Sequence, residues 1–330
     1  MKVGFLIHGL DVSSCRYRVL QYFPYLKDHG IETSVLFYPR TWFARVQFPR
    51  LLKELDLLYI HRKLFHPLEF WLIRKKARKI IYDFDDALMY RSSGPRGPHS
   101  ISRRTKFAYM ARRVDTLVAG NQFLQSEALP YNSHVEIIPT SIDLSHYGVM
   151  NKFHPDGPLV VGWLGSSSTL KYLKLLMPTL EALYQHYPHF QLKIVCDQFL
   201  ESSILPVIQK RWSLEEEGVD LKSFDIGIMP LVDDLWSRGK CGLKILQYYG
   251  AGVPAVVTPV GINRDIVKDG VNGFWARHEE EWKGRLLRLI QDGTLRREMG
   301  LRGRETVKNE YSLEVNEPRI LAVIQRTAAL

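Results

Sequence analysis

Short apolar blocks alternate with polar stretches along the first half of the chain, and this alternation predicts strands separated by helices. Apolar residues recur at helical spacing between several of the blocks, for example from about residue 16 to Gly30, where a glycine suits a helix end. Strands that alternate with helices favour a parallel, doubly wound sheet. The predicted strands are 3–7, 32–37, 57–60, 80–82, 116–118 and 135–138, and further helices are predicted at 67–78, 102–113 and 122–127.

The alternation restarts after residues 139–158, a polar stretch with several prolines and glycines that we interpret as a linker. We therefore expect an α/β chain of two Rossmann-like domains, residues 1–150 and 151–312. Their parallel sheets are expected to face one another across a cleft that holds the ligand. In the second domain, strands are predicted at 159–164, 191–195, 225–229 and 253–258, and helices at 170–187, 240–249, 279–291, 295–309 and 313–326.

Two lysines stand at the start of one predicted helix in the second domain. Lys240 and Lys244 lie one turn apart in the opening turn of the helix at 240–249. A helix N-terminus already carries partial positive charge, so acidic residues would be the stabilising choice there. Lysines suit the position if an anion binds, because backbone N–H groups and two ammonium groups then converge on it. Solvated surface lysines are the alternative. The preceding strand and loop are typical of phosphate sites in open α/β sheets, and we favour the anion site.

A second loop in the same domain also has phosphate-binding character. It follows the strand at 159–164; its glycine lets the backbone approach a ligand, and its hydroxyl groups can bond phosphate or cap a helix. A helix cap without a ligand is the alternative, since the glycines of the G-x-G-x-x-G motif are absent. Lysines at a neighbouring strand end strengthen the phosphate interpretation. The residues concerned are Gly165, Ser166, Ser168, Thr169 and Lys171.

Three carboxylates end a strand of the first domain. Alternation along the strand places Asp83 and Asp85 on one side and Asp86 beyond its end. Clustered carboxylates can bind a cation, accept hydroxyl protons or anchor arginines. A salt-bridge cluster with the arginines of the first half is the structural alternative, and metal binding is the less favoured one.

Polar residues also follow the first strand. Ser14, Arg16 and Arg18 lie in the loop and helix start after residues 3–7. Arg16 and Arg18 are two positions apart and cannot share a helical face, so we expect one to point into the cleft and the other to face solvent. His8 is expected to be a packed histidine.

The net charge of +10 and the pI near 9.4 call for an explanation through a partner or through solubility. Much of the excess lies between residues 62 and 113. The cations show no zinc-finger or basic-zipper spacing, so nucleic acid is the least favoured partner. A solvated basic face and a surface for anionic lipid headgroups or a phosphate-linked acceptor remain equal alternatives.

The length of the chain and its cysteines limit the kinds of protein it can be. The chain of 330 residues is long enough for two domains, and its apolar runs are too short to span a bilayer. The first residues predict a strand rather than a secretory signal. Cys15, Cys196 and Cys241 are widely scattered, which argues against a disulfide framework or a zinc site. We expect a cytoplasmic protein.

The second half resembles a known family. Residues 239–254, together with Thr258, Gly261 and residues 269–274, are similar to the donor domain of glycosyltransferase family 4, and the resemblance extends over nearly the whole chain. It implies the GT-B fold and transfer of a hexosyl group from a nucleotide-sugar co-substrate, with retention and without an essential metal or another cofactor. It also implies that a final helix, 313–330, packs back on the first domain.

The chain departs from the family at two positions. The family carries two glutamates, one near the donor sugar and one on the nucleotide ribose, and the corresponding residues here are Gly239 and Gln247. Gln247 can still hydrogen-bond ribose hydroxyls through its amide. Sugar recognition is therefore expected to shift from Gly239 to neighbours such as Asp233, Asp234 and Trp236, or to the two lysines.

We hypothesise that the lysines and the serine-lined loop hold the donor diphosphate and stabilise charge on the leaving group. The acceptor is left open as a polysaccharide, a lipid-linked glycan of the cell envelope or a small molecule, with peripheral contact to an anionic membrane surface. A nucleotide-sugar epimerase or hydrolase and a non-catalytic basic binding protein are the alternatives. The assigned roles are catalysis for Lys244, Lys240 and Asp86; base and ribose contacts for Pro230, Leu231 and Gln247; and acceptor contacts for Ser14, Arg16, Arg18 and Asp85, with no metal ligand.

Overall fold

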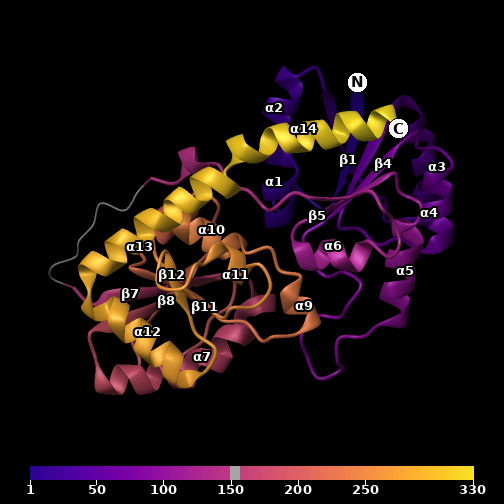
Figure 1. The fold of residues 1–330 in the computed structure, drawn as a ribbon. Helices are drawn as coiled ribbons and strands as arrows, with labels where there is room; N and C mark the ends of the chain where they lie inside the picture. Colours follow the sequence, from indigo (N-terminus) through magenta and orange to yellow (C-terminus); the bar gives the residue numbers. More distant parts are fainter. Residues whose placement is uncertain (149–156) are drawn as a thin grey trace. The chain divides into compact units, whose positions relative to one another are not determined.

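The computed structural model describes residues 1–148 and 157–330, and within these residues the chain forms two α/β units, each built on a six-stranded parallel sheet (Figure 1). Unit 1 comprises Met1–Ser141, Asp234–Cys241 and Leu313–Leu330. Unit 2 comprises Ile142–Asp233 and Gly242–Ser312. The expected boundary at residue 150 lies outside the described residues.

The sheet of unit 1 has the strand order β2-β1-β3-β4-β5-β6. Every neighbouring pair is parallel, so the carboxyl ends of the strands meet at one edge. The strands are β1 Lys2–Ile7, β2 Glu32–Phe37, β3 Leu57–His61, β4 Ile80–Phe84, β5 Thr116–Ala119 and β6 Val135–Ile137. The helices are α1 Ser13–Arg18, α2 Phe23–Asp28, α3 Trp42–Leu51, α4 Pro67–Arg74, α5 Ile101–Ala111, α6 Gln122–Ala128, α9 Leu235–Arg238 and α14 Leu313–Ala329.

Both faces of this sheet carry a hydrophobic core, as a parallel sheet covered by helices requires. Ile60 and Phe84 pack on one face with Phe107 of α5. Phe5 packs on the other face with Ile320 and other residues of the C-terminal helix α14. That helix is further held by a hydrogen bond between the hydroxyl groups of Thr327 and Thr116, so it is part of unit 1.

The sheet of unit 2 has the order β12-β11-β10-β7-β8-β9 and is also parallel throughout. Trp163, Leu173, Phe190 and Phe274 are among the buried residues of its core. The strands are β7 Leu159–Leu164, β8 Phe190–Cys196, β9 Val207–Arg211, β10 Ile226–Met229, β11 Ala255–Val257 and β12 Gly273–Trp275. The helices are α7 Ser167–His186, α8 Glu217–Lys222, α10 Leu243–Gly250, α11 Asn263–Ile266, α12 Glu279–Gln291 and α13 Gly293–Thr306.

The sequence pattern missed or misplaced several elements. The edge strand β9 reads Val-Ile-Gln-Lys-Arg and is largely exposed, so it lacks the apolar run by which the inner strands were found. The three-residue strand β12 and helix α3 were also missed. The helix predicted at 240–249 begins at Leu243 instead, because Gly242 precedes it in a left-handed conformation with φ of 71°. The expectation that Lys240 lies in the opening turn of that helix is therefore wrong.

Among the described residues, no helix is long and apolar enough to cross a membrane. Cys15, Cys196 and Cys241 are all buried free thiols.

Candidate functional site

Helix α10 is tied to the middle of the unit 2 sheet by one tyrosine. The phenol of Tyr248 accepts a hydrogen bond from the Leu164 N–H at the end of β7 and donates one to the Ile228 carbonyl in β10, both at 3.2 Å. Burial raises the pKa of Tyr248, so the phenol stays protonated and keeps donating. This anchoring places Lys244, one helical turn earlier, beside the carboxyl end of β7.

Lys244 contacts the loop between β7 and α7. Its ammonium group donates to Thr169 Oγ1 at 3.1 Å and lies 4.1 Å from the centroid of the Trp163 ring. A Cβ atom at Gly165 would lie 2.6 Å from Lys244 Nζ and 2.5 Å from the Trp163 ring, so this position has no room for a side chain. The glycine therefore allows the lysine, the indole and the loop to pack together. Within unit 2, the structure brings Lys244 to the predicted phosphate loop.

The loop itself presents hydroxyl groups to solvent. Ser166 Oγ and Ser168 Oγ lie 2.8 Å apart on exposed residues, and Thr169 Oγ1 donates to the Ser166 carbonyl. The Ser167 N–H at the start of α7 donates to Asp197 at 2.7 Å, and this contact with Ser167 lowers the pKa of the Asp197 carboxyl. Lys171 lies further along α7, where its ammonium is 5.1 Å from the Tyr172 ring centroid. The β7–α7 loop is therefore polar and accessible to solvent, and the Lys244 ammonium contacts it.

The remaining donor-side residues line the neighbouring strand ends of unit 2. Pro230 is buried directly after β10, and the Leu231 N–H donates to Thr258 Oγ1 after β11 at 3.1 Å. Gln247 lies on α10, three residues after Lys244, and is 2% exposed. Lys244, the β7–α7 loop and Leu231 thus lie at the carboxyl ends of parallel strands in one sheet. Their contacts with a nucleotide stay a prediction.

Lys240 belongs to the other unit. Its ammonium lies 2.9 Å from Asp86 Oδ1 and 4.9 Å from the Trp236 ring centroid, all within unit 1. The amide of Asn121 holds the segment in place by donating to the carbonyls of Arg238 and Lys240. The prediction grouped Lys240 with Lys244 because both were placed in the opening turn of one helix. The intervening Cys241–Gly242 step separates them between two units.

Gly239 fits this segment against the end of β4. A Cβ atom at Gly239 would lie 2.6 Å from the Ala87 Cβ and 2.7 Å from the Ala87 backbone nitrogen. Such distances require the backbone to shift, so a side chain at this position would strain unit 1. The position that corresponds to a family glutamate is therefore closed to any larger residue in this structure.

The three predicted carboxylates are paired with cations. Asp85 Oδ1 lies 3.3 Å from Arg62 Nε, and Asp86 pairs with both Arg62 and Lys240. Burial would raise the pKa of Asp86, but Lys240 and Arg62 together outweigh it and lower that pKa. A carboxylate held ionised by two cations is a poor proton acceptor. Asp86 therefore orients Lys240 and Arg62.

The third carboxylate forms a buried network. Two guanidinium nitrogens of Arg18, Nε and Nη2, donate to the two carboxylate oxygens of Asp83. His61 Nδ1 lies 2.6 Å from Asp83 Oδ2. Burial would raise the pKa of Asp83, but Arg18 and then His61 outweigh it and lower that pKa to about 2. Arg18 is 4% exposed and also donates to the Ile138 carbonyl. These contacts fit the structural alternative for Arg18 and Asp83.

The other first-domain residues lie nearby in unit 1. The Arg16 guanidinium is 5.2 Å from the Tyr17 ring centroid. Ser14 and His8 line a cavity of about 420 Å³ together with Arg62, Lys63 and Arg103. Arg62, Lys63 and Arg103 belong to the basic stretch between residues 62 and 113, and the sequence pattern did not predict a role for any of them. Their only sequence signal was charge, which many surface residues share.

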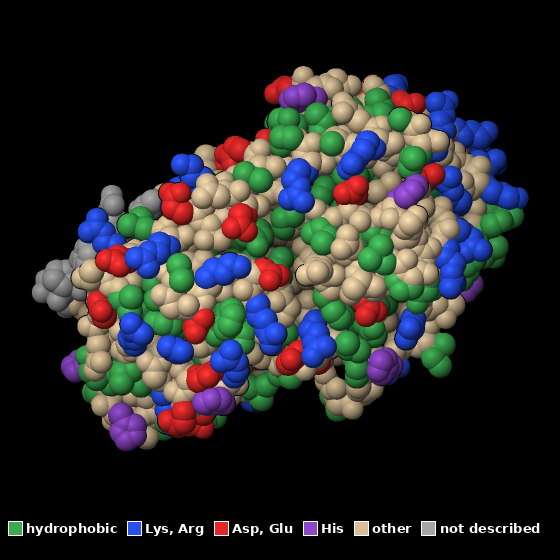
Figure 2. Space-filling view, viewed as in Figure 1, with side chains coloured by type: hydrophobic (Ala, Val, Ile, Leu, Met, Phe, Trp, Pro, Cys, Tyr) green, Lys and Arg blue, Asp and Glu red, His purple; other side chains and the backbone are tan. Residues whose placement is uncertain are grey.

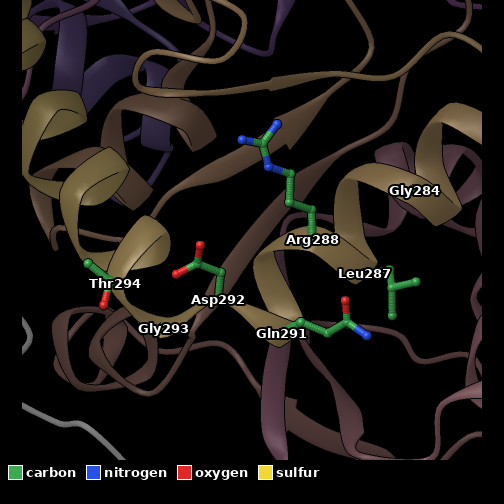
Figure 3. A pocket seen from close by; sticks show the side chains of 7 residues that line it. All are labelled: Gly284, Leu287, Arg288, Gln291, Asp292, Gly293 and Thr294. Atoms are coloured by element: carbon green, nitrogen blue, oxygen red, sulfur yellow. The ribbon is translucent and has the colours of Figure 1, made fainter.

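A larger hollow, of about 640 Å³, lies elsewhere in unit 2 (Figure 3). Gly284, Arg288 and Gln291 of α12 form one side, and Asp292 and Thr294 form the other. Asp292 accepts the Leu295 N–H at 2.8 Å and so caps α13, which accounts for its carboxylate. None of the residues assigned a role from the sequence lines this hollow.

The comparisons with known proteins agree with this geometry. Residues 158–292 match a family model described as "Glycosyl transferases group 1", and this segment contains both the β7–α7 loop and Lys244. These residues form a glycosyltransferase domain. The enzyme class predicted from the sequence is thereby confirmed. A comparison with curated protein sequences finds no significant match.

Solved structures show the fold of the whole chain. It is similar to sucrose-phosphate synthase from Thermosynechococcus elongatus, with 14% identity, 99% coverage of both chains and a TM-score of 0.77. It is also similar to HepE from Anabaena in complex with UDP and glucose, with 15% identity, 98% and 99% coverage and a TM-score of 0.74. The catalytic domain of starch synthase IV from Arabidopsis thaliana, bound to ADP and acarbose, matches with 10% identity, 100% and 99% coverage and a TM-score of 0.70. The predicted GT-B fold with two Rossmann-like units is thereby confirmed.

Proposed function

We propose that the protein transfers a hexosyl group from a nucleoside-diphosphate sugar to an acceptor, with retention and without a metal ion. The observation that carries the proposal is the contact of the Lys244 ammonium with Thr169 at the exposed β7–α7 loop, at the carboxyl edge of a parallel sheet. HepE was solved with UDP and glucose, and starch synthase IV with ADP, which supports a nucleotide donor. Retention follows the resemblance to glycosyltransferase family 4.

The proposed chemistry places negative charge beside Lys244. The bond from the anomeric carbon to the diphosphate oxygen breaks with its electron pair on that oxygen, the acceptor oxygen bonds to the anomeric carbon, and the acceptor proton ends on the released diphosphate. A fixed cation stabilises this charge as it develops, without the cost of reorganisation. Lys244 and the loop residues Gly165, Ser166, Ser168 and Thr169 are assigned to the diphosphate, with Lys171 adding charge. Pro230 and Leu231 are assigned to the base and Gln247 to the ribose.

The acceptor is assigned to unit 1. Ser14 lines the cavity of unit 1, Arg16 is assigned to the acceptor with it, and Asp85 and Asp86 act through Arg62 and Lys240. Lys244 is assigned to balance the charge of the donor diphosphate, and Asp83, Asp85 and Asp86 are already paired with cationic side chains. These contacts support a reaction without a metal ion. We propose an acceptor from the synthesis of cell-envelope polysaccharide.

A thermal-shift experiment tests the donor assignment. UDP, ADP and their glucose conjugates are added to the full chain, with uridine and adenosine as controls that lack phosphate. At a hundredfold excess over Kd, the matching diphosphate is expected to stabilise the protein by about 2.7 kcal/mol, because it binds only the folded state. The nucleosides are expected to have little effect. Equal shifts from nucleoside and diphosphate would show that phosphate is not recognised. Donor turnover with the acceptor omitted would instead identify a hydrolase or epimerase.

We further propose that unit 1 contacts an anionic membrane from the inner face of the cell. Trp42 and Phe43 on α3 are 67% and 73% exposed, and Leu68 and Trp71 on α4 are also exposed. The Lys75 ammonium lies 3.7 Å from the Trp71 ring centroid. Figure 2 shows Lys and Arg side chains gathered beside hydrophobic ones along the edge that carries α3 and α4. Exposed aromatic residues with neighbouring cations suit a membrane interface, where the rings enter the acyl-chain boundary and the cations meet anionic headgroups.

Vesicle sedimentation tests this contact. The Trp42→Ser/Phe43→Ser double variant is expected to bind phosphatidylglycerol-containing vesicles at least about tenfold more weakly than the original protein, because two apolar side chains no longer enter the interface. Leu175→Ser, a change at a similarly exposed residue of unit 2, serves as control and is expected to have little effect. Equal binding by both variants, or equal binding to pure phosphatidylcholine vesicles, would contradict the membrane contact.

A further inference from the structure

The cavity beside Ser14 in unit 1 has a chemistry that the donor assignment does not use. Its volume is about 420 Å³, within the range of roughly 300–1,000 Å³ that is usual for small-molecule sites. His8, Ser14, Arg62, Lys63 and Arg103 supply its polar lining, and Val12, Leu64 and Leu88 supply its apolar wall. No carboxylate is among these lining residues. The cavity therefore presents hydrogen-bond donors and positive charge on an apolar floor.

One lining group lacks a partner. Ser14 is 9% exposed, and its Oγ finds no hydrogen-bond partner among the residues that the structure describes. Leaving a buried hydroxyl unsatisfied is unfavourable, so such groups in native proteins call for an explanation. Ser14 lines the cavity, so rotation of its side chain about χ1 would bring the buried hydroxyl to a ligand oxygen there.

The cations of the cavity are not all neutralised by the protein. Arg62 is balanced by Asp85 and Asp86, so its charge is largely used. Arg103, on the first turn of α5, makes a long contact of 3.5 Å to the Leu88 carbonyl, a neutral group. Lys63 lies 4.8 Å from the Tyr38 ring centroid, and a carboxylate partly balances its charge: burial lowers the pKa of Lys63, whereas Glu69 raises it. Of the three cations, Arg103 is thus the one for which the structure gives a neutral contact rather than a carboxylate, and it leaves positive charge at the cavity.

Two further observations indicate a site under constraint. Among the described non-glycine residues, Arg62 stands out with a positive φ, of 61°, a conformation that is costly for a long side chain. Burial, followed by the charges of His61, Lys63 and Arg62, lowers the pKa of His8. A neutral His8 can donate one hydrogen bond from its ring without adding charge of its own.

We propose that this cavity binds an oxyanion of the acceptor, a phosphate or carboxylate group, through Arg103, Lys63 and the Ser14 hydroxyl. The inference rests on the proposed function, in which unit 1 receives the acceptor. It narrows the acceptor to a molecule that carries a negatively charged group. Charge-assisted hydrogen bonds to arginine and lysine supply the affinity, and the apolar wall accommodates the uncharged part of the acceptor.

Calorimetric titration of the full chain tests the inference, with inorganic phosphate and acetate as probes at constant ionic strength. All proteins carry Lys244→Ala, so that the donor loop contributes as little as possible to anion binding. Adding Arg103→Gln is expected to weaken binding of the preferred probe roughly tenfold or more, and adding Ser14→Ala about fivefold. Arg104→Gln on the same helix changes the net charge equally but lies outside the cavity, and its expected effect is less than twofold.

The outcomes separate this inference from the donor assignment. Binding of either probe that depends on Arg103 but not on Arg104 supports the oxyanion site, and the stronger probe identifies the group. No binding, or equal weakening by Arg103→Gln and Arg104→Gln, overturns it. A thermal shift with nucleoside diphosphate in the Arg103→Gln protein, whose oxyanion cavity is disabled, reports the donor site, so either proposal can fail while the other stands. Unchanged melting temperatures of the Ser14→Ala and Arg103→Gln proteins exclude misfolding as the cause of lost binding.

Discussion

Replacing Lys244 with alanine is expected to lower the rate of sugar transfer by roughly 100- to 1,000-fold. The ammonium group is fixed on Thr169 and beside Trp163, where negative charge would grow on the leaving diphosphate. Removing one such preorganised donor from an enzyme site has an effect of this size. Stability should change little, because the lost contact with the indole ring contributes only about 0.5–1 kcal/mol.

Three measurements check this prediction. The affinity for the nucleoside diphosphate that gives the largest thermal shift should fall roughly 10- to 100-fold, as expected for the loss of a charged hydrogen bond. Lys244→Arg should recover part of the affinity, because it restores the charge. Lys174→Ala removes the same charge from an exposed position of α7 and should leave both binding and rate intact. Full transfer activity in Lys244→Ala would show that the donor diphosphate lies elsewhere.

The second large effect is expected in the stability of unit 1. Asp83→Asn removes the negative charge that faces Arg18, whose side chain is only 2% exposed. Breaking a buried ion pair on one side costs about 3–5 kcal/mol, because the remaining charge stays buried without compensation. Urea unfolding followed through the unit 1 transition should show this loss. Glu136→Gln, which breaks the exposed pair with Arg326, should cost less than about 1 kcal/mol.

The same pair predicts a pH dependence of stability. The carboxyl of Asp83 has a lowered pKa of about 2 in the folded protein, against 3.8 for an ordinary aspartate. Its stabilising contribution is therefore fully present above about pH 4 and is lost as the pH falls toward 2. The original protein should lose roughly 2 kcal/mol more than Asp83→Asn over this window. Parallel stability curves for the two proteins would contradict the role of the charge.

The sequence predicted the parallel sheets and the Lys244 loop because their signals are local. Inner strands of a parallel sheet are nearly continuous apolar runs, and β1, β3, β4 and β7 show them clearly. Lys244 and the β7–α7 loop follow such strands, so their meeting at one sheet edge could be expected from topology alone. Strand β9 has no such run, because it lies at the sheet edge and pairs with β8 alone among the described strands.

What the sequence could not predict depends on distant partners. Arg18 contacts Asp83, which lies 65 positions away in the sequence. The pairing of β4 with β3 buries this carboxylate beside His61, and no local sequence signal predicts that pairing. Lys240 meets Asp86 across 154 positions. A long cationic side chain has the same local signature in an ion pair, in a ligand site and in solvent. Pairing, rather than residue type, decides which of these it is.

The eight-residue segment Asp234–Cys241 is numbered within the second half but built into the first. The polypeptide also returns to unit 1 with its last helix. A single proteolytic cut in the interdomain linker would therefore yield an N-terminal fragment without two of its own pieces and a C-terminal fragment carrying both. Unit 1 would be divided between the two products, so expressing it independently requires a grafted or permuted chain.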